Sequence, residues 1–273
     1  MSGGVMLRVG KCIAVLALWL VACALHAHPG AHASLMVLDQ LIATNPASQA
    51  LRIRRAALLS HEGMFDEALT DLEQARTLAD PGAIDFELGV LQLRRGRLDE
   101  ARLALDRWLQ REPRDFMALL QRARTFGAMG QTGAALQDYE AYFSLAVAPN
   151  PGDYLAAARL VQHEDPVQAL RVLDAGLARL GEVVSLQKLA VTIERRRGRP
   201  DGALARWEEL GDALHHGPAW QVEFARLLLL NGRDADALQT LRLAEEQLAA
   251  LRSTPARDRL REQIFSLRDA AGT

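Results

Sequence analysis

A period of 34 residues, repeated along most of the chain, constrains its fold more than any other feature of the sequence. Successive members of one alanine column are 33, 34, 34, 34 and 34 residues apart, and they are Ala68, Ala101, Ala135, Ala169, Ala203 and Ala237. Five residues before these alanines, every unit except the fourth carries a glycine, and four residues after them every unit carries a large side chain. A period of this length is typical of a row of supersecondary units, each stable only against its neighbours.

Each unit is predicted to be a pair of helices. In the second unit, apolar side chains spread around most of residues 85–95, as in a helix that is packed on several sides. Gly96 then ends this helix, because glycine accepts the left-handed conformation that commonly follows a helix. Ala101 and Leu105 continue a second helix, which stops before Pro113. Small residues in both helices, such as Gly89 and Ala101, predict that the two axes approach closely.

A helix–turn–helix of 34 residues with these small-residue, glycine, large-residue and proline columns resembles the tetratricopeptide repeat family. The match is best over residues 84–113, and it extends over residues 49–250. The resemblance implies an all-α fold, a right-handed α-solenoid of stacked antiparallel helix pairs. The fourth and fifth units depart from the pattern at Glu164-Asp165-Pro166, Val191 and Pro200, so a wider helix crossing or an altered superhelical pitch is predicted around residues 160–205.

Four segments are predicted from these patterns. Residues 1–27 form a signal peptide, residues 28–48 a tail with a capping helix, residues 49–250 six repeats, and residues 251–273 a second capping helix. The apolar stripe of the first capping helix is Leu35, Leu38, Leu41 and Ile42. The corresponding stripe of the second is Leu260, Ile264, Phe265 and Leu267.

The first residues of the chain are typical of a secretory leader. Arg8 and Lys11 precede an apolar run, residues 13–25, that is shorter than the roughly 20 residues of a membrane-spanning helix. Ordinary cleavage near Ala27 is favoured, although residues 20–23 also resemble a lipobox in which Cys23 would be lipidated. We therefore expect export, to the periplasm of a Gram-negative bacterium or to a lipid anchor in its envelope.

Charge and motifs exclude several classes of function. The formal net charge is −2, and it becomes −4 without residues 1–27, so binding of nucleic acid through bulk charge is not expected. No nucleotide-binding glycine loop, zinc-protease motif or serine-hydrolase motif is present, and the repeat leaves no room for a separate catalytic domain. We therefore predict a protein that is not an enzyme, with no catalytic residues, no cofactor and no metal. The histidines near residue 28 are interpreted as an incidental tail.

In the tetratricopeptide repeat family, the first helix of each repeat lines an inner groove. The resemblance places nine residues of this chain there: Ile53, Phe86, Val90, Arg94, Leu120, Arg124, Tyr154, Lys188 and Arg226. Apolar and cationic side chains in alternation favour a peptide or protein partner that carries acids. The leading hypothesis is a scaffold of the cell envelope that binds a polypeptide in this groove. The alternative is a lipoprotein tethered at Cys23 that acts in the assembly of an envelope complex.

Overall fold

The computed structural model describes residues 29–210 and 217–272. The predicted signal peptide and Cys23 lie outside these residues. Within them, fourteen α-helices and one 3₁₀ helix follow one another without a strand. They are α2 (Pro29–Thr44), α3 (Gln49–His61), α4 (Phe65–Arg76), η1 (Pro81–Ile84), α5 (Asp85–Arg94), α6 (Leu98–Arg111), α7 (Phe116–Ala128), α8 (Thr132–Leu145), α9 (Pro151–Val161), α10 (Pro166–Leu180), α11 (Val184–Arg196), α12 (Pro200–Glu209), α13 (Pro218–Leu230), α14 (Asp234–Ala249) and α15 (Pro255–Gly272).

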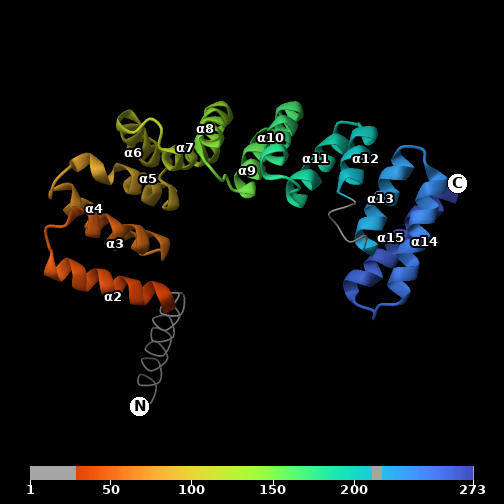
Figure 1. The fold of residues 1–273 in the computed structure, drawn as a ribbon, viewed down its shortest axis with the longest axis horizontal. Coiled ribbons are helices and arrows are strands. Elements are labelled where there is room, and N and C mark those ends of the chain that lie inside the picture. The colour runs from red at the N-terminus through yellow and green to blue at the C-terminus, as the bar shows by residue number, and fades with distance from the viewer. Residues whose placement is uncertain (1–28, 211–216, 273) are drawn as a thin grey trace, which may run out of the picture. The chain divides into compact units, whose positions relative to one another are not determined.

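The helices form antiparallel pairs in two compact units (Figure 1). The described part of the first unit ends at Leu145 and contains α2 and the pairs α3–α4, α5–α6 and α7–α8. The second unit begins at Ala146 and contains the pairs α9–α10, α11–α12 and α13–α14, followed by α15. The predicted all-α fold of stacked helix pairs is confirmed. A boundary between the third and fourth pairs was not foreseen, because the alanine column keeps its spacing of 34 residues across it.

The turns inside the pairs follow the glycine column. Gly63, Gly96, Gly130, Gly198 and Gly232 all have φ between 70° and 80°, a conformation that strains any residue with a side chain. The fourth pair turns without a residue of positive φ. There, Asp165 accepts a hydrogen bond from the backbone N–H of Gln168 at 2.9 Å, and Pro166 occupies the first turn of α10. The fourth pair therefore has a side-chain cap in place of the glycine turn.

Small residues lie where the helices of a pair cross. All six alanines of the column are fully buried. Gly89 in α5 faces α6 so closely that an added Cβ would lie 2.6 Å from Leu105 Cγ. These positions hold the helix axes together, because any larger side chain would have to displace a buried neighbour.

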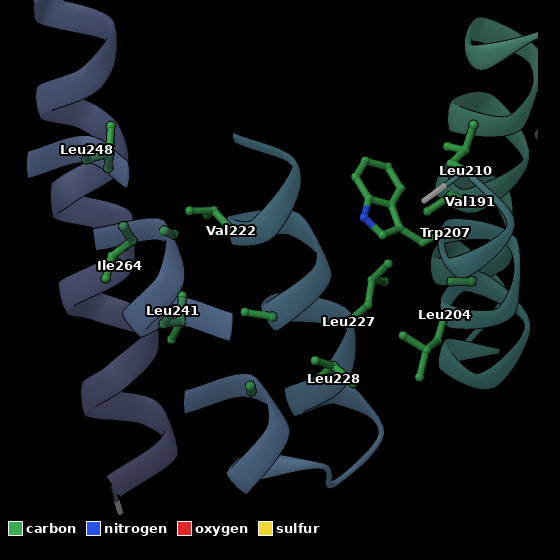
Figure 2. Packing of buried hydrophobic residues seen from close by; sticks show 14 residues of the cluster. Val191, Leu204, Trp207, Leu210, Val222, Leu227, Leu228, Leu241, Leu248 and Ile264 are labelled. Carbon is green, nitrogen blue, oxygen red and sulfur yellow. The ribbon is translucent and has the colours of Figure 1, made fainter. Parts of the chain in front are cut away.

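Each unit has its own apolar core. In the second unit, the core runs from Val191 in α11 through Trp207 in α12 and Val222 in α13 to Ile264 in α15 (Figure 2). The core of the first unit joins α3, α4 and α5, with Leu35 of α2 packed against it. Neither described part includes a helix both long and apolar enough to span a bilayer.

Both terminal helices bury part of the predicted stripe and expose the rest. In α2, Leu38 and Ile42 are buried, whereas Leu41 is 45% exposed. In α15, Ile264 is buried, but Phe265 is 76% exposed. Each predicted stripe therefore includes one exposed residue, Leu41 or Phe265. Each of them is adjacent in sequence to a buried residue, and adjacent side chains point about 100° apart around a helix.

Candidate functional site

The first helices of the pairs form the inner row of each unit. In the first unit α3 contacts α5 and α5 contacts α7, and in the second unit α9 contacts α11. Consecutive second helices have at most marginal contact with one another among the described residues. First helices therefore lie nearer to one another than second helices do over α3–α7 and α9–α11, and we call the free sides of the first helices the inner face.

The inner face of the first unit joins apolar and cationic side chains. Ile53 is half-buried against the core, and Phe86 is half-buried with its ring centroid 6.0 Å from that of Trp108. Val90 is also half-buried, whereas Arg94 and Arg124 are exposed. These five residues lie on α3, α5 and α7, which follow one another along the inner row.

Leu120 does not belong to this exposed set. Its side chain is only 4% exposed, because it packs among the helices of the first unit. Leu120 occupies the same repeat position as Phe86, but the helices around it bury its side chain. Leu120 is therefore a core residue, and we do not retain it as a partner contact.

Glu87 is a half-buried acid of α5. Burial raises the pKa of the Glu87 carboxyl above its ordinary value, and the positive charge of Arg94 partly offsets this rise in pKa. Arg94 thus acts on Glu87 within its own helix while its side chain stays exposed.

In the second unit, Tyr154 is a core residue rather than a surface anchor. It is 2% exposed, and it lies so close to Gly176 that a Cβ there would approach Tyr154 Cγ to 2.9 Å. Burial raises the pKa of the Tyr154 hydroxyl, and Arg179 opposes that rise. The predicted exposure of Tyr154 is therefore wrong, because its ring packs against Gly176 of α10 within its own helix pair.

Arg226 is held by an acid on its own helix. Its guanidinium lies 2.6 Å from one carboxylate oxygen of Glu223, and Arg195 lies 2.5 Å from the other. Glu223 thus forms ion pairs with two cations, Arg226 and Arg195. Arg226 is a weaker candidate for attracting an acidic partner than its position in the column suggested.

Lys188 lies at a pocket of about 390 Å³ in the second unit. Its ammonium nitrogen lies 6.0 Å from the centre of the Trp207 ring, within reach of a cation–π interaction. Trp207 stacks on Trp220 with ring centroids 6.2 Å apart, and Arg257 of α15 supplies a second cation. We name this the tryptophan pocket, and its lining is Lys188, Trp207, Gly217, Pro218, Ala219, Trp220, Leu248, Leu251, Arg257 and Leu260.

No carboxylate is among the described residues that line the tryptophan pocket. Two cations beside stacked aromatic rings can hold an anion next to an apolar group. Sequence reasoning found Lys188 but missed Trp220 and Arg257. The one available signal was that Trp220 follows Pro218 at the start of a first helix, whereas Arg257 lies outside the repeat.

The described residues contain no group of three His, Cys, Asp or Glu side chains placed to hold a metal ion.

No protein-family model and no curated protein matches the sequence. Among solved structures, part of a tetratricopeptide repeat protein from Cytophaga hutchinsonii matches with a TM-score of 0.63 at 13% identity, over 82% of this chain and 92% of that one. PilW, a type IV pilus biogenesis factor, matches with a TM-score of 0.56 at 18% identity, over 66% and 84%. A tetratricopeptide repeat protein from Parabacteroides merdae matches with a TM-score of 0.50 at 16% identity, over 89% and 93%. The chain therefore has the tetratricopeptide repeat fold.

Proposed function

We propose that this chain is a non-enzymatic scaffold of the cell envelope that binds an acidic polypeptide, with the tryptophan pocket as the main contact and exposed side chains of first helices as further contacts. The observation that carries the proposal is the tryptophan pocket, where Lys188 and Arg257 share a lining with Trp207 and Trp220 and with no described carboxylate. An acidic side chain would interact with the cations, and an apolar neighbour in the same peptide would pack on the rings.

The first unit supports the same partner chemistry. Phe86 and Val90 offer half-buried apolar surface on α5, and Arg94 and Arg124 are exposed cations on α5 and α7. Exposed arginines act mainly on the encounter with a partner, whereas aromatic anchors act on its dissociation. An extended peptide needs both kinds of contact, so the two inner faces suit one class of ligand.

The proposed location in the cell envelope depends on residues 1–27, which have the features of a secretory leader. The lipobox-like residues 20–23 support the alternative, a lipoprotein tethered through Cys23 that assists assembly of an envelope complex. Mass spectrometry of the mature N-terminus separates the two forms. A free amine near His28 excludes the tether, and a diacylglyceryl group on Cys23 supports it.

The experiment for the binding site starts with recovery of the partner by cross-linking in an envelope extract. A double change of Lys188→Glu and Arg257→Glu should then slow association with that partner and weaken the salt dependence of its rate. The matched control is Arg259→Glu, an exposed cation of α15 outside the pocket lining, which should leave the rate nearly unchanged. Equal rates for the double variant and the native protein would show that the tryptophan pocket is not the binding site.

A further inference from the structure

Helix α2 exposes two apolar side chains at repeat positions that the six helix pairs bury. Val37 is 54% exposed and Leu41 is 45% exposed. They lie three and seven residues after Ser34, which stands 34 residues before Ala68 and so takes the place of the alanine column. At the position of Val37, the pairs carry buried or half-buried residues, which are Asp71, Ala104, Asp138, Val172, Arg206 and Thr240. At the position of Leu41, the corresponding buried or half-buried residues are Ala75, Trp108, Tyr142, Gly176, Leu210 and Ala244.

Both repeat positions face the first helix of a pair. At the first position, Arg55 of α3 donates to both carboxylate oxygens of Asp71 in α4, at 2.6 Å. At the second position, a Cβ on Gly176 of α10 would lie 2.9 Å from Cγ of Tyr154 in α9. Helix α2 packs on α3 through its other side, and no described helix precedes α2. Among the described residues, α2 is therefore one half of a pair that lacks its first helix.

The uncovered side of α2 is also uncharged. Asp39 is the only Asp, Glu, Lys or Arg of this helix, and its carboxylate accepts a hydrogen bond from Arg55 of α3 at 2.6 Å. We name the uncovered side the end face, and its exposed residues are Ala33, Ser34, Val37 and Leu41. The other terminal helix, α15, instead exposes the charged residues Asp258, Arg259, Glu262, Arg268 and Asp269. Because a row of repeats normally ends in a polar outer surface, an apolar end face marks a site of association.

The end face is complementary to itself under a twofold rotation. A small residue, Ser34, lies near one end of it, Leu41 lies near the other, and Val37 lies between them. When two copies of α2 run antiparallel, each Ser34 is opposite Leu41 of the second copy, and the two Val37 side chains meet near the axis. Small residues also face large ones inside the pairs of this chain, as Gly89 faces Leu105. Since the end face carries no charged group, this arrangement brings no like charges together.

We propose that two copies of this chain associate through their end faces, so that each α2 takes the place of the first helix that the other lacks. A single pair of helices is a small interface, and small interfaces form weak, reversible complexes. We expect a dissociation constant in the micromolar range, about 1–100 µM. The end face belongs to the first unit and the tryptophan pocket to the second, so the dimer stands or falls independently of the function proposed above.

Sedimentation velocity tests the dimer on the full chain and on the chain without residues 1–27, which keeps every described residue. The shorter form should move from the mass of one chain to that of two as its concentration rises through about 1–100 µM. A monomer at all of these concentrations would overturn the proposal. Association only of the form that keeps residues 1–27 would also overturn it, because the leader and not α2 would then make the contact.

Charge reversal of the preference locates the interface. Val37→Lys and Leu41→Lys together should raise the dissociation constant at least about 100-fold, because they bring like charges together across the axis. Both side chains are exposed in the single chain, so circular dichroism should show unchanged helicity. The matched control is Phe265→Lys, which places the same charge at a more exposed apolar residue of α15. Equal dissociation constants for the double variant and this control would show that the copies meet elsewhere.

A single cysteine then tests the twofold axis without disturbing the charge. Residues 28–273 contain no cysteine, so Val37→Cys supplies the one thiol of the shorter form. Oxidation with copper phenanthroline should join most of the dimer through a disulfide between the two Cys side chains. Phe265→Cys, at the more exposed position, is the control and should give little cross-linked product. Equal cross-linking of the two variants, or a dimer that Val37→Cys does not cross-link, would overturn the proposal.

Discussion

Gly89 lies where α5 crosses α6, and a single added methyl group has no room there. An alanine Cβ would lie 2.6 Å from Leu105 Cγ and 3.4 Å from the Ala101 carbonyl oxygen, and Leu105 is fully buried. We expect Gly89→Ala to lower the free energy of unfolding by about 1–3 kcal/mol through overpacking. This loss should exceed the roughly 1 kcal/mol that alanine gains over glycine in a helix. Urea denaturation measures the difference.

Gly133 is the matched control for this substitution. It also lies in a helix, α8, but an added Cβ would meet nothing within 4 Å. Gly133→Ala should leave stability unchanged or raise it by up to about 1 kcal/mol. Similar effects of the two substitutions would mean that Gly89 is not at a tight helix contact.

Glu87 makes the stability of the first unit depend on pH. Because burial raises its pKa in the folded protein, the folded state binds more protons than the unfolded state between the ordinary and the raised pKa. Stability should therefore fall as pH rises through that window. Glu87→Gln should raise the melting temperature at pH 7, and this gain should vanish below about pH 4, where both states are protonated.

Thermal melts of Glu87→Gln across pH 4–8 test this expectation, with Glu73→Gln, an exposed residue of α4, as the control. A gain that is the same at both ends of the pH range would show that ionisation of Glu87 is not its cause.

At the scale of helices, two arginines join three helices each in the first unit. Arg122 of α7 donates to both oxygens of Asp138 in α8, at 2.7 and 2.8 Å, and to Asp106 in α6 at 2.9 Å. Arg55 of α3 makes the same contacts with Asp71 in α4 and Asp39 in α2. The planar guanidinium suits this two-sided contact, which lysine could not make.

Loss of Arg122 should leave Asp138 buried without its main partner. We expect Arg122→Ala to lower the free energy of unfolding by about 2–3 kcal/mol, toward the lower end for broken buried pairs. Arg102 is the control, because it also pairs with Asp106, at 2.9 Å, but within the more exposed surface of α6. Arg102→Ala should lower stability by less than about 1 kcal/mol. Chemical denaturation of both variants decides, and equal losses would contradict a special role for Arg122.

The sequence predicted the helix pairs because contacts inside one pair recur in every repeat. The alanine and glycine columns report such contacts directly. The contacts of Arg55 and Arg122 were not predicted, because only two of the repeats have arginine at this position. Leu120 and Tyr154 are buried by the way the helices pack around them, and the tryptophan pocket needs Arg257 from a helix outside the repeat. Periodicity alone does not record either of these relations.

At the scale of the whole molecule, stacking of neighbouring repeats predicts that a destabilising substitution affects only the helices close to it. Helix α5 contacts α3, α4, α6, α7 and η1, and the second unit has its own core. In such a row, each repeat is stabilised mainly by its neighbours. Gly89→Ala should therefore raise hydrogen exchange in α3–α7 and leave α13–α15 unchanged, as measured by mass spectrometry. A uniform rise along the chain would contradict this near-neighbour stability.

Because lysine is scarce in this chain, Lys188 is a selective site for amine labelling. The sequence holds 32 basic residues, and only Lys11 and Lys188 are lysines. In the proposed mature form, which lacks residues 1–27, the ε-amine of Lys188 is the single lysine amine, and it lies 6.0 Å from the ring of Trp207. An amine-reactive fluorophore applied above the pH at which the α-amine is already neutral would mark this position and the N-terminus alone. The neighbouring indole can quench a fluorophore attached there, so the labelled protein would report optically on what enters the tryptophan pocket.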